Sequence, residues 1–300
     1  MVSIVMPCYN QGSYIKEAIN SVSQQSYTNW ECIIVNDESS DNSLNIIKNL
    51  IKNDSRFKLL DIDNKGVSNA RNVAIEISSG EYILPLDGDD KIHPDYLKLA
   101  IQQFEKDPNT SLVYCNARYF GKKNTLFDLP TYTYEYLFHG NCIFCSAIYK
   151  RKDFYSKTTG YDIELIHGYE DWEFWLQLLD KNSKVLQLNK VLFYYRIKEL
   201  SRNTLVLEEN NLDVTLRHIY GKHYLKYLKN LGGDLKKNET SYSQKGVFIK
   251  YFKEHNLRLG ATLKNEENFI LAEKFKKVKK TISYKLFVKL EMLIKNKVKF

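Results

Sequence analysis

Short apolar runs alternate with longer amphipathic segments along the first 115 residues of the chain. In the longer segments, apolar side chains recur every three or four positions, as in helices with one buried face. We expect strands at residues 2–6, 32–35, 57–60, 82–86 and 112–115, and helices at 14–25, 43–53, 68–79 and 95–106. This alternation predicts right-handed crossovers and a mostly parallel α/β sheet with helices on both faces.

The pattern is less regular beyond residue 115. Strand-like runs occupy residues 142–149, 184–188 and 191–195, and a helix is expected at about 169–179. From residue 205 onward the pattern is helical and polar, which predicts a helical C-terminal extension. The length of 300 residues, 43% of them hydrophobic, suits one large domain plus such an extension. Disorder is not expected, because 22 Tyr, 15 Phe and 3 Trp supply ample surface to bury.

The net charge of +8 comes from the C-terminal end. Residues 273–300 hold ten lysines and two glutamates, which gives +8, so the rest of the chain sums to zero. Apolar side chains recur through the same segment at helical spacing: Phe275, Val278, Ile282, Leu286, Leu290 and Leu293. We therefore expect a basic amphipathic helix on an anionic membrane surface, and no nucleic-acid site. A helix packed against protein is the alternative.

Other features indicate a cytoplasmic protein. No run approaches the roughly 18 apolar residues of a membrane-spanning helix. No basic segment or apolar run precedes Pro7, so we expect no secretory signal. Five cysteines are an odd number, which favours free thiols in a reducing compartment. Cys142 and Cys145 have the Cys-x-x-Cys spacing without a second pair, and we expect them to pack in the interior.

Polar residues follow the predicted strands at their carboxyl ends, where ligands bind in such sheets. After the first strand, Tyr9 in Pro7–Asn10 offers a ring on which a nucleobase can stack, although a plain turn is the alternative. After the second strand, Asp37 can accept hydrogen bonds from a base or ribose. Ser40 or Asp41 can cap the next helix.

Two basic residues and three carboxylates come next along the chain. Lys65 and Arg71 suit phosphate oxygens, although exposed basic side chains usually meet only solvent. Asp87, Asp89 and Asp90 follow the fourth strand, and extended residues at i and i+2 share a face. Such carboxylates can hold Mg²⁺ or Mn²⁺, which then bridges a diphosphate. A solvated acidic turn is the alternative.

A second acidic pair, Glu170 and Asp171, opens the helix expected at 169–179. Aromatic neighbours such as Phe174 and Trp175 would desolvate a carboxylate and raise its pKa, which suits a general base. The alternative is structural, because acidic residues also stabilise helix N-termini. Gly-x-Gly-x-x-Gly, Walker and His-Glu-x-x-His motifs are all missing from the sequence.

In this order, the motifs resemble those of family 2 glycosyltransferases with the Rossmann-like GT-A fold. The resemblance covers about residues 1–203 and is carried by residues 5–10, 35–39, 64–72, 80–83, 86–90, 170–171 and 195–196. It implies a nucleotide-binding part at about 1–115 and an acceptor-binding part at about 116–203. A helical region at 204–300 follows, ending in the basic segment 273–300.

The resemblance also implies roles for single residues. Tyr9 stacks on uracil, Asp37 binds the base, Asp87, Asp89 and Asp90 carry the metal, and Asp171 with Glu170 forms the catalytic pair, Asp171 being the base. The implied donor-binding residues are Pro7, Tyr9, Asn10, Asp37, Lys65, Arg71, Asp87, Arg196 and Lys198. The implied reaction moves one hexosyl group from a UDP-sugar, with inversion, to a hydroxyl of a glycan or lipid-linked glycan. We expect this reaction to belong to the synthesis of a bacterial surface polysaccharide or lipopolysaccharide. The enzyme would act at the inner face of the cell membrane.

The sequence departs from the family pattern at one position of the site. The family often has Tyr-Arg-x-His where this chain reads Tyr195-Arg-Ile-Lys198, so a lysine replaces a histidine that can face the metal and phosphates. The third metal ligand is therefore open, and Lys198 can instead neutralise phosphate charge. The Gln-x-x-Arg-Trp motif of processive synthases is missing, so we expect one sugar per binding event. A nucleotidyltransferase and a non-catalytic nucleotide- or carbohydrate-binding protein are the alternatives.

Overall fold

The computed structural model describes residues 1–198 and 209–231. These residues fall into two compact units. The first contains residues 1–137 and 141–198, and the second contains residues 138–140 and 209–231. The helix expected at 273–300 lies outside the described residues.

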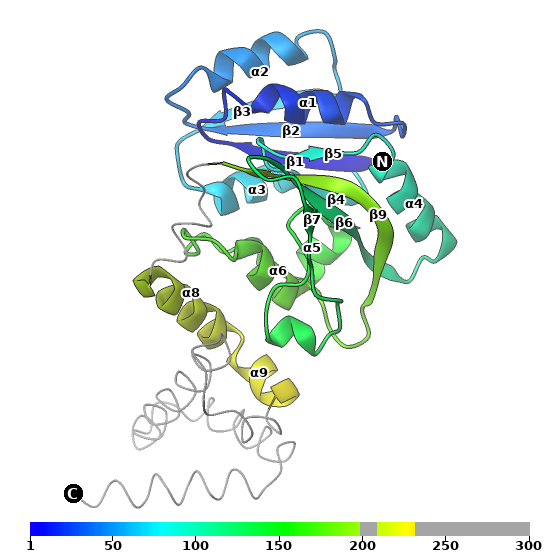
Figure 1. The fold of residues 1–300 in the computed structure, drawn as a ribbon, viewed down its shortest axis with the longest axis vertical. Coiled ribbons are helices and arrows are strands. Elements are labelled where there is room, and N and C mark those ends of the chain that lie inside the picture. Colours follow the sequence, from blue (N-terminus) through cyan, green and yellow to red (C-terminus); the bar gives the residue numbers. More distant parts are fainter. Residues whose placement is uncertain (199–208, 232–300) are drawn as a thin grey trace, which may run out of the picture. The chain divides into compact units, whose positions relative to one another are not determined.

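The first unit follows the predicted alternation of strands and helices (Figure 1). Its first part runs β1 (Val2–Cys8), α1 (Ile15–Ser23), β2 (Trp30–Asp37), α2 (Ser43–Ile51), β3 (Phe57–Ile62), α3 (Val67–Glu76) and β4 (Tyr82–Pro85). The chain continues with β5 (Lys91–Ile92), α4 (Tyr96–Lys106), β6 (Thr110–Gly121), β7 (Leu126–Phe127) and a 3₁₀ turn (Tyr136–Phe138). The remaining elements are β8 (Ile148–Lys150), α5 (Arg151–Lys157), α6 (Glu170–Leu178) and β9 (Lys184–Ile197).

The strands of this unit form one sheet in the order β3-β2-β1-β4-β8-β6-β9-β5, with β7 paired to β6. Strands β3, β2, β1 and β4 run parallel to one another, as predicted. Beyond β4 the sheet is mixed, because β8 runs antiparallel to both β4 and β6, while β9 runs parallel to β6. The parallel half therefore places the carboxyl ends of β1, β2 and β4 at one edge.

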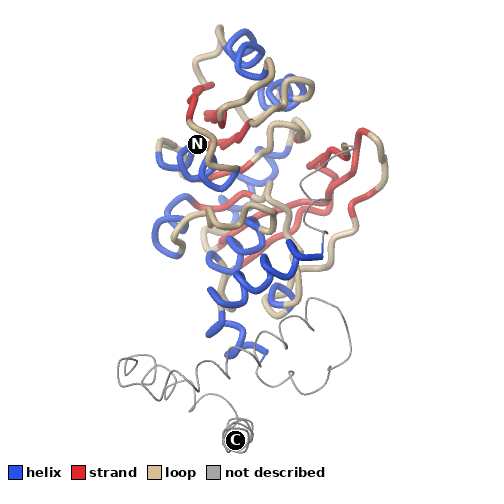
Figure 2. Tube along the Cα trace, turned by 90° about the vertical axis from the view of Figure 1, so that its left-hand side faces the viewer, coloured by secondary structure: helices blue, strands red, loops and turns tan. Residues whose placement is uncertain are grey.

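Alternation along β1 explains how the helices cover the sheet. Val2, Ile4, Met6 and Cys8 belong to the core cluster that also contains apolar residues of α1 and α4. Figure 1 shows α1 and α2 on one face of this part of the sheet and α3 on the other, and Figure 2 shows helices outside the strands in a second view. In α3, Ala70, Ala74 and Ile75 are buried. Both faces of the parallel half are thus covered, as its continuous apolar strands require.

Two sequence-based expectations differ from the structure. Only Ile148–Lys150 of the strand expected at 142–149 is a strand. Residues 142–147 are an irregular but buried segment, in which the Trp175 indole donates to the Ile143 carbonyl at 2.9 Å. Their apolar character reflects burial and not strand pairing. The two strands expected at 184–188 and 191–195 are one strand, β9, whose polar Asn189 sits where the register against β6 is irregular.

The second unit contains α8 (Glu209–Lys222) and α9 (Tyr224–Leu231). Tyr220 and Tyr227 are buried and pack edge to face with ring centroids 5.0 Å apart. Helical structure was expected here from the polar, periodic sequence. Across residues 1–198 and 209–231, none of the helices has the length and apolarity needed to cross a bilayer.

A buried carboxylate joins the start of the sheet to the turn before β4. Glu31 on β2 accepts hydrogen bonds from the Ser3 hydroxyl at 2.6 Å and the Ser79 backbone N–H at 2.6 Å, and pairs with Lys58 at 2.8 Å. Burial by itself would raise the pKa of Glu31, but the hydrogen bonds from Lys58, Ser3 and Ser79 lower it to about 2. Glu31 therefore stabilises the fold in its ionised form.

We predict that Glu31→Gln makes the stability of the protein less sensitive to acid. The folded pKa of about 2 lies below the ordinary value of 4.5, so the contribution of Glu31 is complete above pH 4.5 and is lost as pH falls toward 2. Urea unfolding at pH 7 and pH 4 measures this. The wild type should exceed the variant in stability by more at pH 7 than at pH 4. An equal difference at both values would show that Glu31 carries no such linkage.

Candidate active site

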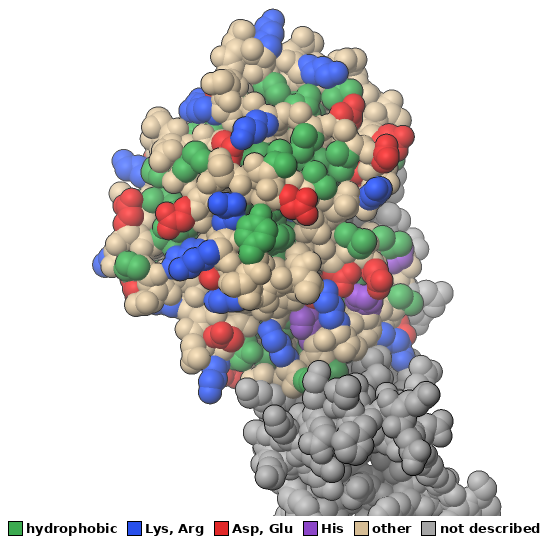
Figure 3. Space-filling view, turned by 180° about the vertical axis from the view of Figure 1, so that it is seen from behind, with side chains coloured by type: hydrophobic (Ala, Val, Ile, Leu, Met, Phe, Trp, Pro, Cys, Tyr) green, Lys and Arg blue, Asp and Glu red, His purple; other side chains and the backbone are tan. Residues whose placement is uncertain are grey.

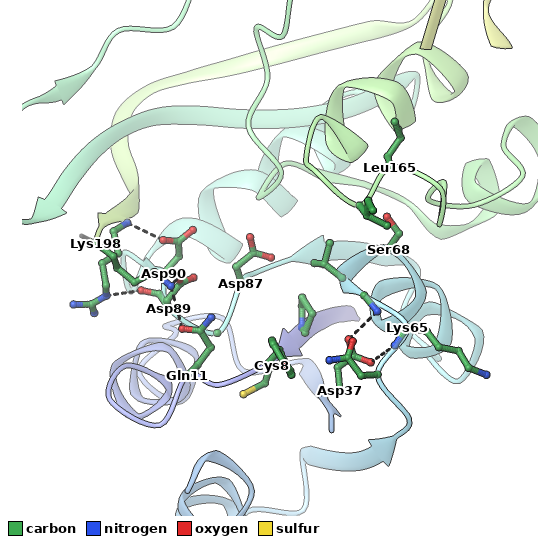
Figure 4. A pocket seen from close by; sticks show the side chains of 18 of the residues that line it. Cys8, Gln11, Asp37, Lys65, Ser68, Asp87, Asp89, Asp90, Leu165 and Lys198 are labelled. Atoms are coloured by element: carbon green, nitrogen blue, oxygen red, sulfur yellow. Dashed lines mark hydrogen bonds and ion pairs between the residues drawn. The ribbon is translucent and has the colours of Figure 1, made fainter. Parts of the chain in front are cut away.

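A pocket of about 340 Å³ lies at the carboxyl ends of β1, β2 and β4 (Figure 4). Residues from four parts of the chain line it: Pro7, Cys8, Tyr9 and Gln11; Asp37; Asn64–Ser68; and Asp87–Asp90. Two later segments complete the wall: Ile163, Leu165 and Ile166, and Tyr195, Arg196 and Lys198. The pocket is where the topology of a parallel sheet predicts a ligand site.

Asp87–Asp90 forms a tight turn, which we call the acidic turn. The Asp90 N–H donates to the Asp87 carbonyl at 3.0 Å, and the Gly88 N–H donates to the Pro7 carbonyl at 3.2 Å. A side chain at Gly88 would lie 3.1 Å from that carbonyl oxygen, so the close approach to β1 favours glycine. The segment is therefore a turn, whereas we expected it to be extended. The turn nevertheless brings oxygens of Asp87, Asp89 and Asp90 within 4.8 Å of one another.

Asp90 is the buried member of the acidic turn, with 2% of its surface exposed. Its Oδ1 accepts from the Arg196 N–H at 2.8 Å, whereas its Oδ2 has no hydrogen-bond partner within the described part of the chain. Burial, and then the charges of Asp89 and Asp87, raise the pKa of Asp90 well above its ordinary value. An unpartnered buried oxygen beside two more carboxylates fits a hard divalent cation such as Mg²⁺ or Mn²⁺.

Arg71 on α3 joins the acidic turn to the second acidic motif. Its side chain is completely buried and pairs with Asp87 at 2.6 Å and with Glu170 at 2.9 Å. We expected Arg71 to contact phosphate. In the structure its guanidinium is held by two carboxylates as a bridge between them, and Arg71 is not among the residues that line the pocket.

Arg196 and Lys198, at the end of β9, lie against the acidic turn. Arg196 donates from Nε to the Asp89 carbonyl at 2.7 Å and from Nη2 to Glu17 at 2.8 Å. The Lys198 ammonium pairs with the Asp89 carboxylate and donates to Gln11 Oε1 at 3.3 Å. Both residues line the pocket, but in this state their charges are directed at protein oxygens.

Asp171 and Glu170 begin α6, directly after Tyr169 in a left-handed conformation (φ 64°). Asp171 accepts from the Trp172 N–H at 2.7 Å and from the Asn141 amide at 3.0 Å. Burial, and then the charge of Glu170, raise the pKa of Asp171 to about 6, while Arg71 opposes this rise. Glu170 is 3% exposed and is the counterion of Arg71. The geometry thus favours Asp171 over Glu170 as a proton acceptor.

The predicted donor-side residues after β1 divide into two groups. Pro7 and Tyr9 line the pocket, and Tyr9 is 48% exposed. Asn10 does not line it. Its side-chain oxygen accepts from the backbone N–H groups of Ser40 and Asp41 at 2.8 and 3.2 Å, and its backbone is left-handed (φ 53°). Asn10, which we expected to contact the donor, therefore holds the ends of β1 and β2 together.

Asp37 and Lys65 lie on the opposite side of the pocket from the acidic turn (Figure 4). Asp37 is 3% exposed, and its two oxygens accept from the backbone N–H groups of Lys65 at 3.0 Å and Gly66 at 2.9 Å. Asp37 thus fixes the loop before α3, where Gly66 has a positive φ of 87° that favours glycine. The Lys65 side chain is exposed.

Sequence reasoning missed several residues of the site. Asn141 orients Asp171 across 30 positions of sequence, and no motif surrounds it. Ile163, Leu165 and Ile166 line the pocket from the loop before α6. Apolar residues in a loop do not by themselves indicate that the loop lines a pocket. Gln11 contacts Lys198. The signal for it in the sequence is its position directly after Pro7–Asn10.

Comparisons with known proteins agree with this geometry. A family model described as Glycosyl transferase family 2 matches residues 3–163, more than half of the chain. The chondroitin synthase of Pasteurella multocida (strain Pm70) is 36% identical over 118 residues, which are 39% of this chain and 12% of that protein. The chain thus matches only a small part of that longer relative.

A second relative is matched over most of its length. UDP-Glc:alpha-D-GlcNAc-diphosphoundecaprenol beta-1,3-glucosyltransferase WfgD of Escherichia coli is 32% identical over 206 residues, covering 67% of this chain and 79% of that protein. Among solved structures, S. aureus TarS 1-349 in complex with UDP-GlcNAc superposes with a TM-score of 0.65 at 18% identity, covering 85% of this chain and 80% of that chain. The chain belongs to glycosyl transferase family 2 and has the GT-A fold.

Proposed function

We propose that this glycosyltransferase moves one sugar from a UDP-sugar to a hydroxyl of a glycan, with inversion at the anomeric carbon. One observation carries the proposal: Arg71 ties the acidic turn to the Glu170–Asp171 pair, so a cation site and a base belong to one connected site. The two acidic motifs then have different tasks. The acidic turn serves the departing diphosphate, and Asp171 serves the acceptor.

The uridine moiety of the donor would lie on the Tyr9 side of the pocket. The exposed Tyr9 ring provides a stacking surface worth about 1–3 kcal/mol for a base. Asp37 and the loop that it fixes would border the base and ribose. The names of the relatives support this choice of donor, because WfgD uses UDP-Glc and TarS was solved with UDP-GlcNAc.

Asp87, Asp89 and Asp90 would hold Mg²⁺ or Mn²⁺. When bound, the cation neutralises negative charge that develops on the diphosphate leaving group. Arg196 and Lys198 line the same part of the pocket and add positive charge. Because the leaving group is stabilised in this way, it needs no proton from a protein acid.

Asp171 would remove the proton from the acceptor hydroxyl as its oxygen attacks the anomeric carbon. A pKa of about 6 keeps Asp171 ionised at neutral pH while making it a better proton acceptor than an ordinary aspartate. Asn141 and the Trp172 N–H hold the carboxylate in place. Glu170 keeps Arg71 neutralised and so preserves the bridge.

The names of the relatives and the basic C-terminal sequence support a proposal for the acceptor and the cellular site. We propose a lipid-linked glycan acceptor in bacterial surface polysaccharide synthesis, because WfgD is named for a diphosphoundecaprenol-linked acceptor. The catalytic domain would be residues 1–203, and residues 204–300 would form a helical region. Its basic segment 273–300 would attach the enzyme to the cytoplasmic face of the membrane.

We predict that UDP binding depends on Mn²⁺ or Mg²⁺. Calorimetry should give clearly weaker UDP affinity in chelator than in Mn²⁺. Asp90→Asn keeps an oxygen for the Arg196 N–H but removes the carboxylate charge, so it should lose most of the Mn²⁺ effect. The exposed Asp128→Asn is the matched control and should behave as wild type. UDP affinity that is the same in chelator and in Mn²⁺ would remove the cation from the mechanism.

We predict that Asp171→Asn lowers turnover by on the order of 10²–10⁴-fold, because the amide cannot accept the proton. UDP affinity should be retained, since Asp171 acts on the acceptor. In the wild type, the rate should be full well above pH 6, reach about half at pH 6 and fall further below it, as Asp171 becomes protonated. An active Asp171→Asn enzyme beside an inactive Glu170→Gln enzyme with normal stability would reverse the two roles.

A further inference from the structure

We propose that Lys198 is an internal cation of the acidic turn that competes with the divalent metal ion for Asp89. In the absence of the metal ion, the Lys198 ammonium pairs with the Asp89 carboxylate. When the donor binds, its diphosphate takes over the ammonium, and the Asp89 carboxylate can then bind the metal ion. The first part concerns this chain's own residues and needs no donor. The second part rests on the proposed function.

The Lys198 side chain is held at the acidic turn by three contacts. Its Nζ pairs with Asp89 Oδ2, donates to Gln11 Oε1 at 3.3 Å, and lies 5.3 Å from the centre of the Tyr14 ring. Figure 4 shows Lys198, Asp89 and Gln11 together beside Asp90. Unlike histidine, a charged lysine has no lone pair to offer a metal ion. It therefore cannot serve as the third ligand and must oppose metal binding at Asp89.

Three described cations surround the acidic turn, and they differ in how firmly they are held. Arg71 is completely buried between two carboxylates. Arg196 is 9% exposed, bonds the Asp89 carbonyl and Glu17, and lies 4.2 Å from the centre of the Phe120 ring. Lys198 is 19% exposed and lines the pocket on a flexible stem. It is the cation of the three that a ligand can displace most easily.

The oxygens of Asp90 and Asp89 differ in how open they are to a metal ion. Asp90 Oδ2 is buried and has no hydrogen-bond partner among the described residues, whereas Asp89 Oδ2 is occupied by Lys198. A divalent cation that enters beside Asp90 and binds Asp89 would therefore lie close to the Lys198 ammonium, and the repulsion between the two cations opposes its binding. The donor carries phosphate oxygens that can take over the ammonium, so metal and donor should strengthen each other's binding.

The test measures Mn²⁺ binding to the full chain by calorimetry, first without nucleotide and then with saturating UDP. Lys198→Met should bind Mn²⁺ about five- to tenfold more tightly than wild type without UDP, since a competing charge is gone. UDP should improve Mn²⁺ affinity by a smaller factor in the variant than in the wild type. Lys198→Gln is the second variant, and it should shift in the same direction.

Lys184→Met is the matched control. Lys184 is the first residue of β9, Lys198 follows its last residue, and Lys184 also pairs with an aspartate, Asp107. This control removes the same charge from the protein and should leave Mn²⁺ affinity unchanged. Both Lys198 variants should give the native circular dichroism spectrum.

Equal or weaker Mn²⁺ binding by the folded Lys198 variants, without UDP, would overturn the proposal. So would an absence of Mn²⁺ binding in wild type and variants alike. Binding by the variants where the wild type binds none would support it. Tighter Mn²⁺ binding by the Lys198 variants, together with a wild type that transfers no sugar from any UDP-sugar, would contradict the proposed function and leave the competition at Asp89 intact.

Discussion

The site depends on one buried guanidinium. Arg71 is withdrawn from water, and its charge is balanced by Asp87 from the turn after β4 and Glu170 from the start of α6. These two carboxylates are far apart in sequence and would repel each other without it. Removing one partner of a buried ion pair typically costs about 3–5 kcal/mol, because a charge is left uncompensated. The bridge therefore fixes the acidic turn and the Glu170–Asp171 pair relative to each other within the first unit.

This arrangement gives the carboxylates unequal properties. Glu170 is the counterion of Arg71, while Asp171 accepts from the neutral Asn141 amide and Trp172 N–H; burial, and then the charge of Glu170, raise the pKa of Asp171 to about 6. On the other side, burial, and then the charges of Asp89 and Asp87, raise the pKa of Asp90. Burial and pairing thus give the two clusters of acidic residues different properties, which suit the proposed base and the proposed cation site.

The parallel half of the fold and most of the pocket could be predicted from the sequence, because strand and helix periodicities differ and strand ends meet at one edge. The contacts of buried polar side chains could not be predicted from the sequence. Arg71 and Asn10 occur in motifs that suggested donor contact, yet each is used to hold backbone or carboxylates together. Asn141 has no motif, and residues 142–147 are mostly apolar because they are buried, with the Trp175 indole donating to the Ile143 carbonyl. Such roles depend on partners that sequence spacing does not identify.

The most direct test of the Arg71 bridge is a double-mutant cycle between Asp87→Asn and Glu170→Gln, read as the free energy of unfolding in urea. Each single variant leaves Arg71 one ionised partner, whereas the double variant leaves neither. The double variant should therefore lose about 1 kcal/mol or more beyond the sum of the single losses, and this excess should vanish in an Arg71→Met background. Losses that add within about 0.5 kcal/mol in the wild-type background would contradict the account.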